Sequence, residues 1–147
     1  MPDRTIPPKD VIDIHATAHA FFTRIDRFDD EAVIALMAPE FEWVRANAAV
    51  IRDIRTLRET LAARSRARVT RHLVTNVEIR AYSPDKAQVD CDILVFEKDD
   101  ASESAGPALV SGPSSLLSSS DELVKVEGEW RIAKKQARAV FKIGKSP

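Results

Sequence analysis

The hydrophobic pattern of the chain changes period near residue 69, and this change constrains the fold more than any other feature. Before that point, apolar residues recur every three or four positions, and after it they alternate with polar residues. The first spacing predicts amphipathic helices, and the second predicts strands whose two faces differ. Because the helices come first and a run of strands follows, the sequence predicts an α+β fold with a mostly antiparallel sheet.

The expected elements follow from these periods and from the turn residues between them. We expect helices over 9–28 and 29–37, two short strands around a turn near Asn47, and a third helix that Asp53 caps. Four long strands are expected over 69–82, 87–97, 109–126 and 130–141, with tight turns at 83–86 and 127–129. Residues 99–107, rich in Ser, Gly and Ala, are expected to form a flexible hairpin tip.

The length and charge of the chain narrow the class of protein. A chain of 147 residues suits one domain, and we expect a mobile leader over 1–8 and a single domain over 9–147. The net charge of −1 offers no basic excess for nucleic acid or for an anionic membrane surface. No apolar run approaches the ~18 residues of a membrane span, and no secretory signal is visible. The single cysteine, Cys91, fits a reducing compartment, so we expect a cytoplasmic protein.

The first predicted helix carries ionisable residues on the side that it must bury. On a helical wheel, a narrow stripe inside the apolar arc contains His15, His19, Phe22 and Asp26. An inward carboxylate is costly unless a partner pairs with it. The stretch "RHLVTNVEI" offers such a partner, because strand alternation places His72 on one face with Val74 and Asn76.

A family resemblance runs through nearly the whole chain. It is carried by "FFTRIDRFDDEAV", "FEWVRANAAVIRD", "TRHLVTNVEI" and "EWRIAKKQARAVF". With these segments the chain resembles the SnoaL-like branch of the nuclear-transport-factor-2-like superfamily, which includes polyketide cyclases, scytalone dehydratase and ketosteroid isomerase-like enzymes. The resemblance implies a cystatin-like cone, in which a curved, mixed, mostly antiparallel sheet wraps a long N-terminal helix and encloses a pocket.

The resemblance also implies a catalytic pair. In dehydratase-like members, an Asp on the first helix and a His on the sheet form a pocket dyad, and Asp26 and His72 match those positions. We interpret His72 as the general base or acid and Asp26 as the group that orients it. The alternative is a buried polar pair that only locks helix to sheet. The dehydratase pattern also places tyrosines near the dyad, whereas the only tyrosine here is Tyr82.

Further side chains are expected to shape or gate the pocket. These ligand-binding residues are Trp43, Phe22, Arg45 and His19. His15 and His19 have the i, i+4 spacing of helical metal ligands, but no HExxH motif accompanies them. We therefore expect neither a metal site nor a cofactor.

Two functional hypotheses remain open at this stage. The first is a pocket for a small apolar or aromatic ligand, with cofactor-free dehydratase, isomerase or cyclase chemistry. The second is a non-catalytic subunit or binding module, because residues 71–141 are also similar to the small subunit of aromatic-ring-hydroxylating dioxygenases. In either case helices can cover only one face of the sheet. We therefore expect a homodimer or higher homo-oligomer through the outer face of the strands over 109–141.

Overall fold

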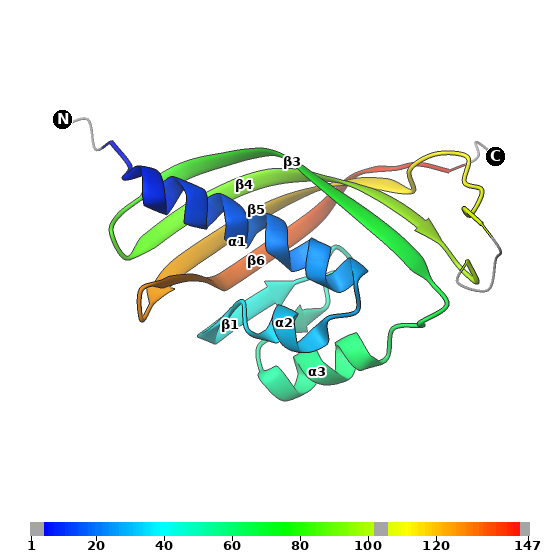
Figure 1. Ribbon diagram of the computed structural model, residues 1–147, viewed down its shortest axis with the longest axis horizontal. Helices are drawn as coiled ribbons and strands as arrows, with labels where there is room; N and C mark the ends of the chain where they lie inside the picture. Colours follow the sequence, from blue (N-terminus) through cyan, green and yellow to red (C-terminus); the bar gives the residue numbers. More distant parts are fainter. Residues whose placement is uncertain (1–4, 102–105, 145–147) are drawn as a thin grey trace.

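The structure is a computed structural model that describes residues 5–101 and 106–144, drawn in Figure 1. The helices in these residues are α1 (Pro8–Asp26), α2 (Asp30–Ile34) and α3 (Ile54–Ala62). The strands are β1 (Met37–Val44), β2 (Val50–Ile51), β3 (Val69–Tyr82), β4 (Lys86–Lys98), β5 (Ser115–Val126) and β6 (Glu129–Lys142). This order of helices and strands confirms the predicted α+β class.

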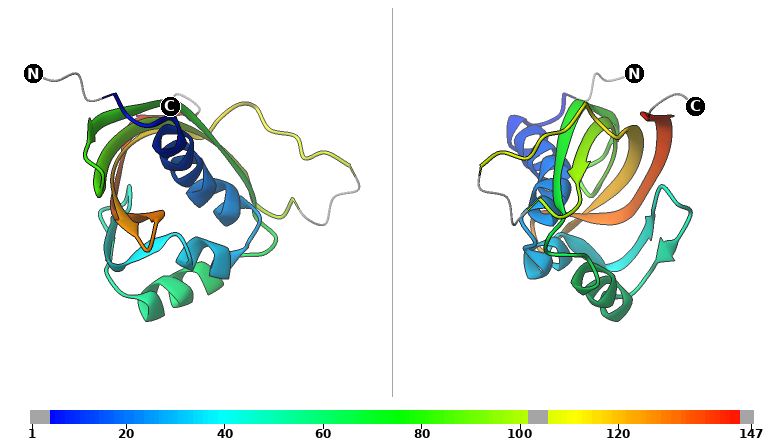
Figure 2. Two further views of the ribbon diagram at one scale, coloured as in Figure 1. Left: turned by 60° about the vertical axis from the view of Figure 1, so that its left-hand side comes forward. Right: turned by 90° about the vertical axis from the view of Figure 1, so that its right-hand side faces the viewer.

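The strands form one curved sheet in the order β2-β1-β6-β5-β4-β3. Strand β1 runs parallel to β6, and every other neighbouring pair is antiparallel. Figure 2 shows the sheet curling around α1, while α2 and α3 lie near the β1 end of the sheet. The sheet is therefore mixed and mostly antiparallel, and it wraps the long N-terminal helix as the family resemblance implies.

Helix α1 fills the concave side of the sheet. It begins with Pro8 in its first turn, where the missing N–H of proline costs no helical hydrogen bond. Its buried face consists of Asp10, Ile14, Thr17, Ala18, Phe21, Phe22 and Ile25. The apolar members of this face join one core cluster with the inward side chains of the strands. Within the described residues, no helix is long and apolar enough to cross a membrane.

Several predicted boundaries are wrong, and long-range pairing explains two of them. Helix α2 stops at Ile34, because Met37 already belongs to β1 and pairs with Ile132 of β6. Strand β5 begins at Ser115 instead of 109, because Ser115 is the first residue that pairs with both neighbouring strands, with Val95 of β4 and Lys142 of β6. Helix α1 ends at Asp26, two residues early, and it already includes position 8 of the expected leader. Residues 1–4 of that leader and 102–105 of the expected hairpin tip lie outside the described residues.

A β-bulge in β3 corrects the predicted strand faces. Thr75 pairs with Asp92 and Glu78 pairs with Asp90, so β3 has one extra residue between these pairs. Asn76 sits in the bulge with a φ of 52°, and its amide donates a 2.9 Å hydrogen bond to Asp92. Asn76 is therefore exposed instead of sharing the inward face with His72. Val77 and Ile79, which were expected on the opposite face, pack against the core.

An unpredicted polar cluster joins the start of α1 to the far ends of the strands. The Asp10 carboxylate accepts hydrogen bonds from Tyr82 Oη (2.6 Å), Trp130 Nε1 (3.0 Å) and Lys125 Nζ (3.0 Å). These donors, led by the Tyr82 hydroxyl, lower the pKa of Asp10 to about 2. The Tyr82 hydroxyl thus holds the start of α1 against the sheet through its hydrogen bond to Asp10.

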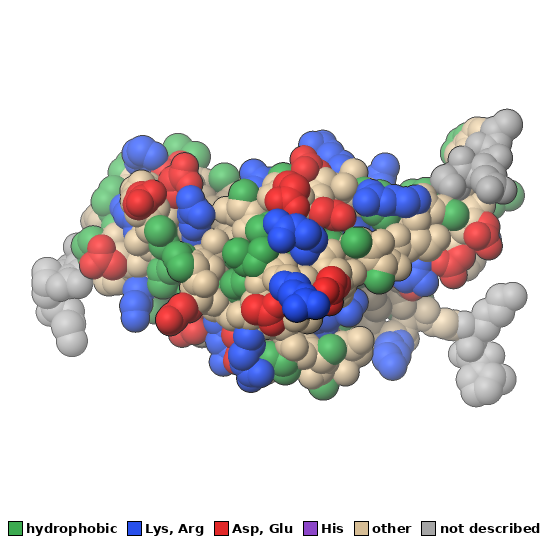
Figure 3. Space-filling model, turned by 90° about the horizontal axis from the view of Figure 1, so that it is seen from below, with side chains coloured by type: hydrophobic (Ala, Val, Ile, Leu, Met, Phe, Trp, Pro, Cys, Tyr) green, Lys and Arg blue, Asp and Glu red, His purple; other side chains and the backbone are tan. Residues whose placement is uncertain are grey.

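The exposed side of α3 carries arginines that form ion pairs with glutamates. Arg58 pairs with Glu31 of α2 at 2.9 Å, and Arg55 pairs with Glu59 at 3.1 Å. Figure 3 shows positive and negative side chains interspersed on this side of the molecule. Asp53 caps α3 as predicted, because its carboxylate accepts a 2.8 Å hydrogen bond from the Thr56 backbone N–H.

Candidate active site

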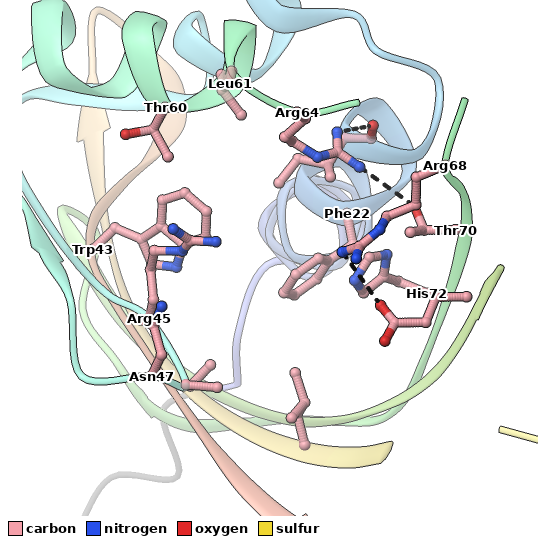
Figure 4. A pocket seen from close by; sticks show the side chains of 15 residues that line it. Phe22, Trp43, Arg45, Asn47, Thr60, Leu61, Arg64, Arg68, Thr70 and His72 are labelled. Atoms are coloured by element: carbon pink, nitrogen blue, oxygen red, sulfur yellow. Dashed lines mark hydrogen bonds and ion pairs between the residues drawn. The ribbon is translucent and has the colours of Figure 1, made fainter. Parts of the chain in front are cut away.

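A cavity of about 470 Å³ lies between the end of α1, the C-terminal part of α3 and the concave face of the sheet. Its apolar lining consists of Phe22, Ile25, Trp43, Ala46, Leu61, Leu117 and Ala137. Its polar lining consists of Arg45, Asn47, Thr60, Arg64, Arg68, Thr70, His72 and Glu97. Figure 4 shows Trp43 and Arg45 on one side of the cavity, facing Phe22, His72 and Arg64 on the other.

Asp26 and His72 meet at the wall of this cavity, which confirms the predicted contact between helix and sheet. The His72 Nδ1 atom lies 2.6 Å from Asp26 Oδ1, and the backbone N–H of His72 donates to Asp26 Oδ2 at 2.7 Å. Thr70 donates its hydroxyl to Asp26 Oδ1, also at 2.7 Å. Both ring and carboxylate are largely buried, with side-chain exposures of 12% and 7%.

The hydrogen bonds decide the charge state of Asp26. Burial by itself would raise the pKa of this carboxyl, but the bonds from His72 and Thr70 outweigh burial and leave the pKa below its ordinary value of 3.8. Asp26 is therefore a carboxylate at neutral pH. A carboxylate at this position requires the proton of a neutral His72 ring to be on Nδ1.

The opposite nitrogen of His72 is left available to the cavity. The imidazole stacks on the Phe22 ring, with ring centroids 4.6 Å apart and an interplanar angle of 18°. With Nδ1 held by Asp26, Nε2 points away from the carboxylate, and it has no hydrogen-bond partner among the described residues. The ring is thus fixed on one face and at one nitrogen, which is the arrangement that an oriented base needs.

Trp43 reaches the cavity from the end of β1, and Arg45 reaches it from the residue directly after that strand. The Trp43 ring packs edge-on against Phe21, with centroids 5.0 Å apart, and the Arg45 guanidinium lies 5.4 Å from the Trp43 centroid. Trp43 is buried, yet its Nε1 has no hydrogen-bond partner within the described part of the chain. The sequence-based expectation that Phe22, Trp43 and Arg45 lie at the pocket agrees with these positions.

His19 does not reach the cavity. It lies on the exposed side of α1, because the buried stripe of the helix follows Ile14, Ala18 and Phe22 instead. We therefore leave His19 out of the candidate site. In the described residues, no group of three or more His, Cys, Asp and Glu side chains is placed to hold a metal ion.

A comparison of the sequence with protein families identifies the family of the chain. The sequence model of the SnoaL-like domain family matches residues 9–136 of the chain. The chain belongs to the SnoaL-like domain family. A search of curated proteins found no match.

Solved structures similar to this SnoaL-like domain share its fold. A candidate scytalone dehydratase from Novosphingobium aromaticivorans is 17% identical, with a TM-score of 0.74 over 95% of this chain and 89% of the other. A candidate aromatic ring hydroxylase from the same species is 14% identical, with a TM-score of 0.73 over 95% of each chain. A candidate dehydratase of the nuclear-transport-factor-2-like family from Streptomyces avermitilis is 17% identical, with a TM-score of 0.71 over 92% of this chain and 99% of the other. The nuclear-transport-factor-2-like fold is therefore shown.

Sequence reasoning missed two arginines of the SnoaL-like domain that line the cavity. Arg64 follows α3 and donates to the backbone carbonyl of Ile25 at 2.6 Å, and Arg68 pairs with Asp99 at 2.7 Å. Both lie in "RSRAR", a segment for which we predicted no function. The signal that could have revealed them is their place in the sequence. They lie between the helix that Asp53 caps and the strand that carries His72, and this connection passes the pocket.

Proposed function

We propose that residues 9–147 form a single SnoaL-like domain that binds a small apolar or aromatic ligand in the cavity between α1, α3 and the sheet. The volume of about 470 Å³ lies within the range of ~300–1,000 Å³ that is typical of small-molecule sites. Aromatic side chains stand on two of its walls, at Phe22 and Trp43. Such a lining favours a flat, apolar ligand over a strongly hydrated one.

We infer that the chemistry is cofactor-free proton transfer by His72, and the 2.6 Å contact between its Nδ1 and Asp26 carries this inference. In a dehydration, Nε2 takes a proton from a carbon next to a carbonyl group. The electron pair of that C–H bond forms the new double bond as the C–O bond of a neighbouring hydroxyl breaks. His72 then returns its proton to the departing oxygen, so water is released. The carboxylate of Asp26 stabilises the imidazolium between the two steps.

A cavity-filling substitution tests whether the ligand binds where we propose. Ala137 is buried on β6 and lines the cavity, so Ala137→Phe places a ring in the space that a ligand would occupy. We expect any aromatic hydroxy-ketone or polyketide-like compound that binds the wild type to lose at least tenfold in affinity, about 1.4 kcal/mol. The measurement is isothermal titration calorimetry with hits from such a panel.

The matched control is Ala62→Phe, which adds the same ring to the exposed side of α3. It should leave both the affinity and the melting temperature within error of the wild type. Unchanged ligand affinity in Ala137→Phe, with the fold intact by circular dichroism, would place the ligand elsewhere on the protein.

A second candidate function is a non-catalytic subunit or binding module. The observation that favours it is the fold shared with the candidate aromatic ring hydroxylase over 95% of both chains. Native mass spectrometry of the complex purified from its source separates the two proposals. A co-purifying iron–sulfur subunit, together with partner affinity that survives His72→Gln, would favour the subunit.

We also expect the protein to form a homodimer in solution. Several large apolar side chains of the sheet and of the segment before β5 are exposed, among them Leu73, Leu109, Val140 and Phe141. Phe141 on β6 is 61% exposed, and burying such side chains against a second copy would remove apolar surface from water.

Phe141→Ser should therefore weaken the dimer in sedimentation velocity runs. Ile12→Ser, which changes an equally exposed residue of α1, is the control, and a wild type that stays monomeric at micromolar concentration would contradict the expectation.

A further inference from the structure

The cavity carries more positive than negative charge. Its lining includes three arginines, Arg45, Arg64 and Arg68, and one carboxylate, Glu97. Arg68 is the member of this set that is already neutralised, by Asp99 at 2.7 Å and by Glu97 at 3.8 Å. The remaining two guanidinium groups have no carboxylate within 4.0 Å among the described residues, in contrast to the ion-paired arginines on α3.

Arg64 is held rigidly although it lacks a counter-ion. Its Nη1 donates to the carbonyl of Ile25 at 2.6 Å, its Nη2 to the Thr70 hydroxyl at 3.4 Å, and its guanidinium lies 4.7 Å from the Phe28 centroid. Burial lowers the pKa of this guanidinium below its ordinary value. The carboxylates of Asp26 and Asp30 offset part of the cost of burying this cation from distances beyond 4.0 Å, and an anionic ligand would offset more of it.

Arg45 places further unused donors on the opposite wall, next to Trp43. The Arg45 side chain is half-buried and makes neither an ion pair nor a hydrogen bond with the described residues. Trp43 beside it is 7% exposed, and its buried Nε1 is not accessible from the cavity, so this side chain contributes an aromatic surface. The Arg45 guanidinium lies over the Trp43 ring, 5.4 Å from its centroid, and its own fork of N–H donors suits the two oxygens of a carboxylate.

We propose that the ligand of this cavity is an aromatic carboxylate whose carboxylate binds at Arg45, next to the Trp43 ring. The inference rests on the proposed ligand-binding function and names its substrate class. The ring lies between Trp43 and Phe22, and Arg64 adds positive potential from the facing wall (Figure 4). The Asp26 carboxylate lies behind the lining of the cavity, where it accepts hydrogen bonds from His72 and Thr70, and its negative charge acts on the Arg64 guanidinium. The arrangement directs the anionic end away from His72 and leaves the rest of the ligand facing its Nε2.

The test compares 2-naphthoate with its neutral counterpart 2-naphthamide by isothermal titration calorimetry at neutral pH. We expect the carboxylate to bind the wild type at least tenfold more tightly than the amide. Arg45→Gln should weaken the affinity for 2-naphthoate about 10–100-fold, which is the usual contribution of a hydrogen bond to a charged group. It should change the affinity for 2-naphthamide by no more than about twofold. Arg45→Lys, which keeps the charge, should retain part of the preference.

The control variant is Arg52→Gln, because Arg52 is exposed, pairs with Glu42 at 2.9 Å and does not line the cavity. It should change neither affinity. Equal binding of the two compounds, or an Arg45→Gln variant that still prefers 2-naphthoate by the wild-type factor, would overturn the carboxylate proposal while the cavity itself still binds neutral compounds. If neither naphthalene compound nor any compound of the neutral panel binds, both this proposal and the proposed function are wrong.

Discussion

His72→Gln is expected to lower the turnover of any substrate found for this protein by about 10²–10⁴-fold, the usual contribution of a positioned acid–base group. The reason is that Gln keeps a polar side chain of similar reach but cannot take a proton from the substrate. Fold stability should change little, because the Gln amide can still donate to Asp26. The measurement is steady-state kinetics beside thermal melts of the same preparations.

Two companion variants make this result interpretable. His15→Gln changes a half-buried histidine of α1 that does not line the cavity, so it should leave turnover within about twofold of the wild type. Asp26→Asn should reduce turnover more than ligand affinity, because it removes the negative charge that fixes the tautomer of His72 and keeps the cavity shape. Turnover that survives His72→Gln would show that the pair is structural and that the base lies elsewhere.

Lys135→Met is expected to destabilise the fold by about 3–5 kcal/mol, the cost of leaving one partner of a buried ion pair alone. Lys135 on β6 and Asp121 on β5 both have no exposed side-chain surface, and Nζ lies 2.9 Å from Oδ2 and 3.2 Å from Oδ1. The ammonium also lies 4.9 Å and 4.8 Å from the ring centroids of Phe21 and Phe22. The methionine side chain would fill the space but leave the Asp121 carboxylate without its cation. Urea unfolding followed by circular dichroism measures the loss.

The neighbouring lysine provides the control for this substitution. Lys134 has a 42% exposed side chain and lies 3.8 Å from Glu42, so Lys134→Met should cost no more than about 1 kcal/mol. The double variant Lys135→Met, Asp121→Leu should recover much of the lost stability, since apolar side chains of similar volume often replace a buried pair without loss. A Lys135→Met variant as stable as Lys134→Met would mean that Asp121 finds water or another donor.

The parts of the fold that the sequence predicted correctly depend on local signals. The ends of β3 at Val69 and Tyr82 follow from alternation and from the turn residues after it, and Asp53 was recognised by its place before an amphipathic stretch. The contact between Asp26 and His72 needed one more step, namely that an inward carboxylate must find a partner. The family resemblance indicated which strand supplies that partner.

The parts that the sequence did not predict depend on register across the sheet. Lys135 looks like an outward residue by its charge, yet the irregular pairing of β5 with β6 beside Ile132 turns it inward, opposite Asp121. The predicted orientation of Asn76 was wrong for a similar reason, because one extra residue in β3 reverses which of the following side chains face the core. The three donors around Asp10 come from β3, β5 and β6, so their meeting point is not visible before the strands are aligned.

The cluster around Asp10 has a consequence for how the chain folds as it is made. Its three partners follow Asp10 by 72, 115 and 120 residues, so α1 leaves the ribosome well before any of these partners has been synthesised. At ~5–20 residues per second, its apolar face waits on the order of ten seconds for the final hairpin. Contacts this distant in sequence also slow folding once the chain is free, because long loops must close first. The cluster around Asp10 therefore closes only after the start of β6 has been synthesised, and a chain that ends before Trp130 keeps β3 beside α1 but lacks one of the three donors to Asp10.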